Sequence, residues 1–291
     1  MTNAPRPTKN QRREEAREAA RIAREKTLKR QKLLRWLIPT VSSVAILAIV
    51  AGVVWAVIAF QPPPKQEAGP ANMLSDGMVF EADGDGGMRY VPTKAIAEGT
   101  DPVATTPRDD LLNIVMYADL SCPVCKAFEQ INNEYIHSLV AEGKATLEVH
   151  PIAILDYRGY TTDFSTRVNT AAACVANYRP ESFLDVMEAA YAEQPAEGGP
   201  GLGNSKITDI VKSAGVDDPE VNACISGQVF QPWVSAATQR ALQGPLPNTE
   251  VPKVTGTPTV IVNGELFSPT PEEGGFGSTT AFPNFVRSLS S

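Results

Sequence analysis

The chain has 291 residues, 43% of them hydrophobic and 20% charged, a balance that excludes a collagen-like or wholly disordered protein. Its length suits one sizeable domain with appendages, or two small domains. The net charge of −7 is unevenly spread, because residues 1–36 hold twelve Lys/Arg against four Asp/Glu and the remainder holds fourteen against twenty-nine. This acidic body argues against nucleic acid as the main partner.

Residues 37–60 form an apolar stretch without a single charge, directly after the basic residues 1–36. A helix of this length spans roughly 36 Å, enough for a hydrocarbon core of about 30 Å. Positive charge stays on the cytoplasmic side, so we expect a cytoplasmic segment at 1–36, a single-pass transmembrane helix at 37–60 and an extracytoplasmic remainder. The alternative, a cleaved signal peptide, has an apolar core of only about 7–15 residues, which favours an uncleaved signal-anchor in the cell membrane.

Residues 61–71 (QPPPKQEAGPA) are Pro-rich and polar, which predicts a semi-extended spacer outside the membrane. We place this linker at 61–74 and a single domain at 75–291. The domain is expected to begin with an edge strand at 78–80 and a turn at 82–88.

A strand, a helix and a second strand follow. The β-branched run at 114–117 predicts a buried strand, and residues 146–150 predict the second. Between them, apolar side chains recur at helical spacing over residues 126–140. This order implies a parallel pair of strands joined by a right-handed crossover.

The next part of the chain is mostly helical, and we place a helical insertion at about 158–242, with a Gly/Pro-rich loop at 195–203. The chain returns to β structure at 258–262, where Asn263 and Gly264 predict a hairpin turn. The domain is therefore expected to be an α/β fold with a helical block between two groups of strands. The remaining elements are expected at 163–178, 181–193, 205–214, 217–226 and 230–242 (helices of the insertion), 265–267 (strand) and 280–290 (closing helix).

Cys122 and Cys125 form a C-x-x-C motif where the first strand gives way to a helix. Unpaired amides and the helix dipole favour a thiolate at a helix N-terminus, which suits Cys122. Cys125 lies about one turn deeper and can form or resolve a disulfide with it, while Pro123 suits the first helical position. We predict a redox pair in which Cys122 exchanges with substrate and Cys125 resolves the mixed disulfide.

Two other interpretations of the motif are a metal site and a purely structural disulfide. Zinc needs two further ligands, yet the chain has no second C-x-x-C, and His137 and His150 are its only histidines. We expect both histidines to be ordinary helix and strand residues, and we predict neither metal nor cofactor.

Cys174 and Cys224 lie in two expected helices of the insertion. In an oxidising compartment they are expected to form a structural disulfide across that block. Two buried thiols or a second redox pair are the alternatives.

The segments YADLSCPVCKAF (117–128) and VTGTPTVIVNG (254–264), together with the helical insertion, resemble the DsbA-like branch of the thioredoxin superfamily over roughly residues 75–290. The resemblance implies a thioredoxin-like fold, with Pro258 as a cis-proline facing the cysteines and Thr257 contacting the substrate. Strongly oxidising members often carry His where this chain has Val124, so a weaker oxidant is expected.

Asp119 lies three residues before Cys122. It is either a proton carrier, or a carboxylate that raises the pKa of a thiol, behind the pair. The alternative is a cap or a hydrogen-bonding group at the strand end. The sequence does not decide between these roles.

The leading functional prediction is an enzyme that forms disulfides in exported proteins. Its partners would be reduced or unfolded exported chains and, by the family resemblance, a quinone-linked membrane oxidase. A membrane-tethered reductase or isomerase uses the same chemistry and is the first alternative. A redox-silent chaperone or binding module is the second, and the intact C-x-x-C at a helix start argues against it.

Overall fold

The computed structural model describes residues 67–289, which are built around a sheet with strand order β2-β1-β4-β3-β5-β6. β3 and β4 pair in parallel, as the strand–helix–strand order predicts. The other neighbours in this sheet pair antiparallel. The strands are β1 (Met78–Ala82), β2 (Met88–Tyr90), β3 (Leu112–Ala118), β4 (Ala145–Pro151), β5 (Thr259–Val262) and β6 (Glu265–Phe267).

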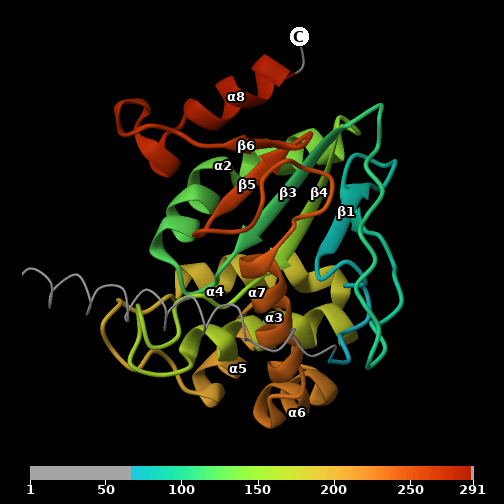
Figure 1. Cartoon of the computed structure of the whole chain (residues 1–291). Coiled ribbons are helices and arrows are strands. Elements are labelled where there is room, and N and C mark those ends of the chain that lie inside the picture. Colours follow the sequence, from blue (N-terminus) through green and yellow to red (C-terminus); the bar gives the residue numbers. More distant parts are fainter. Residues whose placement is uncertain (1–66, 290–291) are drawn as a thin grey trace, which may run out of the picture. The chain divides into compact units, whose positions relative to one another are not determined.

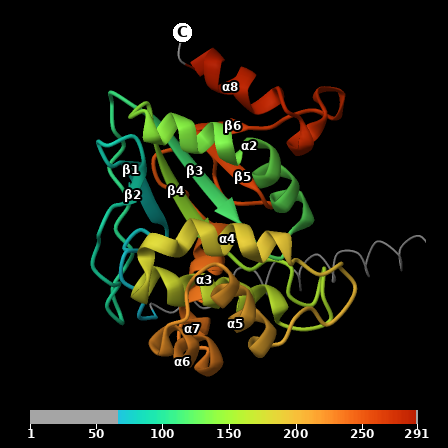
Figure 2. The same cartoon turned by 180° about the vertical axis from the view of Figure 1, so that it is seen from behind.

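The helices form two groups around this sheet (Figure 1). α2 and α8 cover one face, and the block α3 to α7 lies beyond the end at which β3 stops, as Figure 2 shows from behind. All lie close to their expected bounds, so the α/β fold with a helical insertion is confirmed. The helices are α2 (Pro123–Ala141), α3 (Phe164–Tyr178), α4 (Phe183–Ala192), α5 (Asn204–Ser213), α6 (Pro219–Gly227), α7 (Gln231–Gln243) and α8 (Ala281–Leu289), with short 3-10 turns at Pro180–Ser182, Pro271–Glu273 and Gly275–Gly277.

The two faces of the sheet build two separate cores. Side chains alternate along a strand, so Ile114 and Met116 of β3 and Val260 of β5 enter the large core beneath α2. Tyr117 and Ile261 point the other way, into a small core closed by the end of α7 and the loop after it. The end of β3 is therefore packed on both faces, which holds the chain rigidly where the cysteine motif begins.

A cluster of aromatic rings fastens α8 to the sheet. Phe282 of α8 packs edge-on against Phe128 of α2 at 5.3 Å between ring centroids and against Phe267 of β6 at 5.2 Å. Edge-to-face pairs of this kind add to the burial of the rings themselves. The expected closing helix thus packs beside α2 over the edge strand β6.

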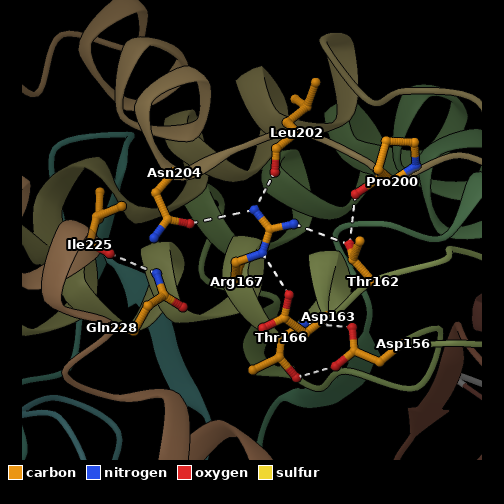
Figure 3. Close-up of polar contacts among 10 residues, drawn as sticks. All are labelled: Asp156, Thr162, Asp163, Thr166, Arg167, Pro200, Leu202, Asn204, Ile225 and Gln228. Atoms are coloured by element: carbon orange, nitrogen blue, oxygen red, sulfur yellow. Dashed lines mark hydrogen bonds and ion pairs between the residues drawn. The ribbon is translucent and has the colours of Figure 1, made fainter.

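Two connections tie the helical insertion together. A disulfide of 2.05 Å joins Cys174 of α3 to Cys224 of α6. In addition, Arg167 of α3 donates to Asp163 Oδ1 at 2.9 Å and to the carbonyl oxygen of Leu202, as Figure 3 shows. The Gly/Pro-rich loop at 195–203 is therefore held against the start of α3.

The domain begins earlier than predicted. Met73 is buried in the core, and the Asn72 side-chain amide donates to the Ala176 carbonyl at 2.8 Å. Gly69 donates its backbone N–H to the Ile96 carbonyl at 2.9 Å. The composition of 61–74 is that of a linker, but a few specific contacts decide where packing starts, so residues from about 69 onward belong to the domain.

The predicted cytoplasmic segment and transmembrane helix at 37–60 lie outside the described residues. Over residues 67–289, no helix is both long and apolar enough to cross a membrane. The anchor and the orientation of the chain therefore stay predictions from the sequence.

Candidate active site

The cysteine motif lies at the junction between the end of β3 and the start of α2. Cys122 has extended backbone angles (φ −86°, ψ 121°) and is the N-cap of α2, with Pro123 at the start of the helix. Both cysteines are thiols in this structure, and both are buried: Cys122 is 6% exposed and Cys125 is 1% exposed. Proline suits the first helical position because its absent N–H would have no partner there.

The pKa of the Cys122 thiol is lowered to about 6. The largest cause is a hydrogen bond with the Cys125 side chain, followed by the Thr257 side chain and the backbone N–H groups of Cys125 and Val124; burial opposes the shift. These N–H groups are the unpaired amides of the first helical turn, which stabilise negative charge. Cys122 is therefore mostly a thiolate at pH 7.

Cys125 has the opposite character. Burial raises the pKa of its thiol well above the ordinary value, and the neighbouring Cys122 raises it further. The pair thus consists of one nucleophilic thiolate and one protonated, buried thiol. This is the asymmetry that thiol–disulfide exchange through a mixed disulfide uses, because one sulfur meets the substrate and the other resolves the adduct.

The loop before β5 lies against the cysteine motif, although it is distant in the sequence. The Thr257–Pro258 peptide bond is cis, and the Cys122 thiol donates to the Thr257 carbonyl at 3.4 Å. Val124 is 45% exposed beside the pair. The structure therefore brings the predicted residues Thr257 and Pro258 to Cys122, although 135 positions separate Thr257 from that cysteine.

Asp119 is fully buried and accepts hydrogen bonds from the segment after β3, the loop after β4 and helix α3. Its carboxylate receives the backbone N–H of Ser121 at 2.8 Å and of Ile154 at 2.9 Å. The Ser165 hydroxyl donates to it at 2.6 Å and the Asn169 side-chain amide at 3.1 Å. The hydrogen bonds show a structural role, since this carboxylate joins the end of β3 to the loop after β4 and to α3. The charge of Asp119 is also among the causes that raise the pKa of the Cys125 thiol, as predicted for a carboxylate behind the pair.

Several residues that hold the cysteine motif in place were not predicted from the sequence. Ser165 and Asn169 lie four positions apart on α3 and so share one face, but the first half of this helix holds other polar residues, and the pattern does not single these two out. Tyr160 donates its hydroxyl to the Ser121 carbonyl at 3.0 Å, and Gln194 donates to the Leu120 carbonyl at 3.0 Å. These two come from loops, where periodicity gives no information.

The two histidines lie away from the cysteine pair. His150 stacks on Tyr117 at 4.4 Å between ring centroids and lies 3.2 Å from the Glu148 carboxylate, on the sheet face opposite α2. His137 is a half-buried residue of α2. Across residues 67–289, no cluster of three or more His, Cys, Asp or Glu side chains is arranged to hold a metal ion.

Comparison with known proteins gives the family. The thioredoxin family model matches residues 110–275, more than half of the chain. No curated protein matches the sequence significantly.

Among solved structures, the reduced form of the disulfide bond oxidoreductase DsbG from Mycobacterium tuberculosis is 27% identical, covering 56% of this chain and 78% of that one with a TM-score of 0.46. Reduced DsbA from the same organism is 26% identical, covering 64% and 91% with a TM-score of 0.46. Oxidised BdbD from Bacillus subtilis is 15% identical, covering 77% and 97% with a TM-score of 0.51, which shows a shared fold.

The thioredoxin family model and the cysteine pair at the helix start define a thiol–disulfide oxidoreductase, as predicted. The chain belongs to the thioredoxin family.

Proposed function

We propose that this enzyme forms disulfides in exported proteins by passing its Cys122–Cys125 disulfide to them. The observation that carries the proposal is the lowered pKa of Cys122 beside the raised pKa of Cys125. A stabilised thiolate favours the reduced pair, which makes the disulfide form an oxidant. A thiol whose pKa is lowered to about 6 is a good leaving group, which supports transfer of the disulfide to a substrate.

The geometry supports a two-step exchange. A substrate thiolate attacks the Cys122 sulfur, which lies nearer the surface, and Cys125 leaves from the broken bond. The second substrate thiolate then attacks the substrate sulfur of the mixed disulfide and releases Cys122, whose thiolate is a good leaving group because its pKa is low. The half-buried Thr257 and the exposed Val124 lie beside the attacked sulfur, where an extended substrate chain would lie, with Pro258 buried behind them.

The proposed location is outside the cytoplasm, on a membrane anchor. The apolar stretch at 37–60 and the basic residues before it support the anchor and its orientation. The Cys174–Cys224 disulfide supports an oxidising compartment, because such bonds persist there and are rare in the cytosol. In that setting a quinone-linked membrane oxidase is the proposed partner that restores the Cys122–Cys125 disulfide.

A reductase or isomerase is the second candidate, and Val124 is the observation that favours it. A histidine at that position would add a stabilising partner for the thiolate, and this chain lacks one. The same pair would then have to be kept reduced by an electron donor.

A refolding assay tests the proposal. The oxidised full-length chain is added to reduced, denatured ribonuclease, and the return of ribonuclease activity is followed. We expect disulfides to be transferred stoichiometrically, and both Cys122→Ser and Cys125→Ser to abolish the transfer, because neither variant can form the Cys122–Cys125 disulfide. An oxidised chain that leaves ribonuclease reduced would contradict the proposed direction.

A further inference from the structure

Cys125 needs a proton carrier, because its thiol is buried and its pKa is high. Each time the Cys122–Cys125 bond opens, Cys125 leaves as a thiolate in a site that penalises charge, and each time the bond closes, its thiol must lose a proton. Bulk water does not reach it readily, since the residue is 1% exposed. A side chain close to Cys125 must therefore give and take this proton.

Asp119 is poorly suited to that task. Both of its carboxylate oxygens already accept hydrogen bonds: Oδ1 from Ser121 and Asn169, Oδ2 from Ile154 and Ser165. Adding a proton would displace one of these buried donors, and an unpaired buried donor costs about 1–3 kcal/mol. A different acid has to serve Cys125.

A cavity between α2 and α4 is lined by such an acid. Its volume is about 370 Å³, and Figure 2 shows α4 passing beside the N-terminal half of α2. Glu129 lies in its wall, four positions after Cys125, which places the two side chains on the same face of α2. The cavity is lined by Glu129, Gln130, Asn133, Glu134 and His137 of α2 and by Glu188, Tyr191 and Ala192 of α4.

Tyr191 of α4 lines the same cavity as Glu129. Its side chain is 2% exposed and has a hydroxyl without a hydrogen-bond partner among residues 67–289. Burial raises the pKa of this hydroxyl, and the negative charges of Cys125 and Glu129 raise it further. An unpaired buried hydroxyl is costly in a folded protein, so one held beside two titrating groups calls for an explanation.

Glu129 has the acidity that the task requires. Burial and the charge of Glu188 raise the pKa of its carboxyl group to about 7. The other titratable groups that line the cavity are Glu188 and Tyr191 of α4, and Glu134 and His137 on the same helix as Glu129. A group that is half protonated near neutral pH can act both as acid and as base.

We propose that Glu129 donates a proton to Cys125 and accepts it back through the hydroxyl of Tyr191. This inference rests on the proposed exchange function and adds a proton path to it. Water in the cavity connects Glu129 to solvent and restores its protonation state after each exchange.

Oxidation of a substrate uses this proton path in one direction. A substrate thiolate attacks the Cys122 sulfur, and the electron pair of the Cys122–Cys125 bond goes to the Cys125 sulfur. The Tyr191 hydroxyl gives its proton to that sulfur and takes one from Glu129, which becomes a carboxylate. The substrate sulfur is oxidised to the disulfide level, Cys125 is reduced to a thiol, and every transfer reverses when Cys125 resolves a mixed disulfide.

The test isolates the Cys125 step in the full-length chain. The reduced protein is mixed with oxidised glutathione, quenched with acid and analysed by mass, which separates formation of the Cys122–glutathione adduct from its resolution by Cys125. In the wild type, we expect the resolution rate to follow a titration near pH 7. In Glu129→Gln, we expect resolution to slow by about tenfold or more and to lose that titration, while adduct formation keeps its rate.

Two further variants separate this role from a structural one. Tyr191→Phe is expected to slow resolution as Glu129→Gln does, and the double variant to be no slower than either, because both lie on one path. Glu134→Gln, on the same helix and cavity wall, is the matched control and should resolve the adduct at the wild-type rate. Glu188→Gln should move the titration to lower pH, since it removes the charge that raises the pKa of Glu129.

The outcomes distinguish this inference from the proposed function. If the wild type forms no glutathione adduct at Cys122, the exchange function itself is contradicted. If the adduct forms and Glu129→Gln resolves it with the wild-type rate and pH profile, the proton path through Glu129 is wrong and the exchange function stands.

Discussion

At the scale of single residues, the chemistry depends on how differently two neighbouring thiols are held. Cys122 faces the unpaired amides of a helix start, whereas Cys125 is almost completely buried, and burial penalises its thiolate. The Asp119 carboxylate fixes the backbone between β3 and α2 through its hydrogen bonds. Position therefore creates the asymmetry, because the two side chains are chemically identical.

Alkylation measures this asymmetry directly. In the reduced full-length chain, the rate of Cys122 alkylation by iodoacetamide should follow a titration with a midpoint near about 6. Cys125→Ala should raise the midpoint, because the hydrogen bond with Cys125 is the largest cause of the lowered pKa. A midpoint above 8 in the wild type would show that the helix start does not stabilise the thiolate.

Asp119→Asn should destabilise the fold. The substituted amide keeps one acceptor oxygen but turns an NH2 group toward buried donors that include Ile154 N–H and the Ser165 hydroxyl. Leaving such donors unpaired costs about 1–3 kcal/mol each, so we expect a loss of about 2–5 kcal/mol in chemical denaturation. Asp163→Asn, at a more exposed ion pair, is the control and should cost less than about 1 kcal/mol.

At the scale of elements, the closing helix α8 depends on one aromatic side chain. Phe282 is fully buried and its ring contacts Phe128 of α2 and Phe267 of β6. Phe282→Ala should lower the free energy of unfolding by about 3–5 kcal/mol, as deletions of buried aromatic rings do. Phe285→Ala on the same helix removes a half-buried ring and should cost clearly less; equal losses would mean that α8 is not anchored through Phe282.

The disulfide of the helical insertion is a second element-scale feature. It joins α3 to α6 across a sequence separation of 50 residues. In the chain-entropy model, a loop of this length stabilises the fold by roughly 4 kcal/mol. The double variant Cys174→Ala, Cys224→Ala should lose stability of that order in thermal unfolding while Cys122 keeps its alkylation rate, since the redox pair is separate from this bond.

At the scale of the whole molecule, the lowered pKa of Cys122 links redox state to pH-dependent stability. A thiol whose pKa is depressed by folding stabilises the fold fully above its unfolded pKa of about 8.5, and this stabilisation is lost as the pH falls through about 6. The raised pKa of Cys125 acts only above about 8.5, where it opposes folding. Reduced protein should therefore gain stability over oxidised protein between pH 6 and pH 8, measured by denaturation of both forms; a constant difference would contradict the shift.

Much of this architecture could be predicted because it follows from patterns within short stretches of the sequence. Apolar periodicity marks β3, α2 and the helices of the insertion, and the motif around Cys122 sits at a strand–helix junction that the pattern alone reveals. The Thr257–Pro258 loop was placed by the family resemblance, and the structure brings it to Cys122.

The rest could not be predicted because it depends on contacts between distant segments. The short strand β2 depends on its pairing with β1 and on the packing of Met88 and Tyr90 against the core, and the packing of Met73 depends on side chains far along the chain. The cavity that joins Glu129 to Tyr191 exists only once α4 lies against α2. A helix pattern shows that each residue is on a helix, but it does not show which helices meet.

The reduction potential of the Cys122–Cys125 pair tests the central claim most directly. The full-length chain is equilibrated with glutathione buffers and the fraction of reduced pair is measured, with Cys122→Ala as the control that removes the signal. A disulfide donor is expected to have a potential at or above roughly −180 mV, because such a pair passes its bond to folding proteins. A potential near roughly −270 mV, as in thioredoxin, would contradict the oxidase and make the chain a reductase.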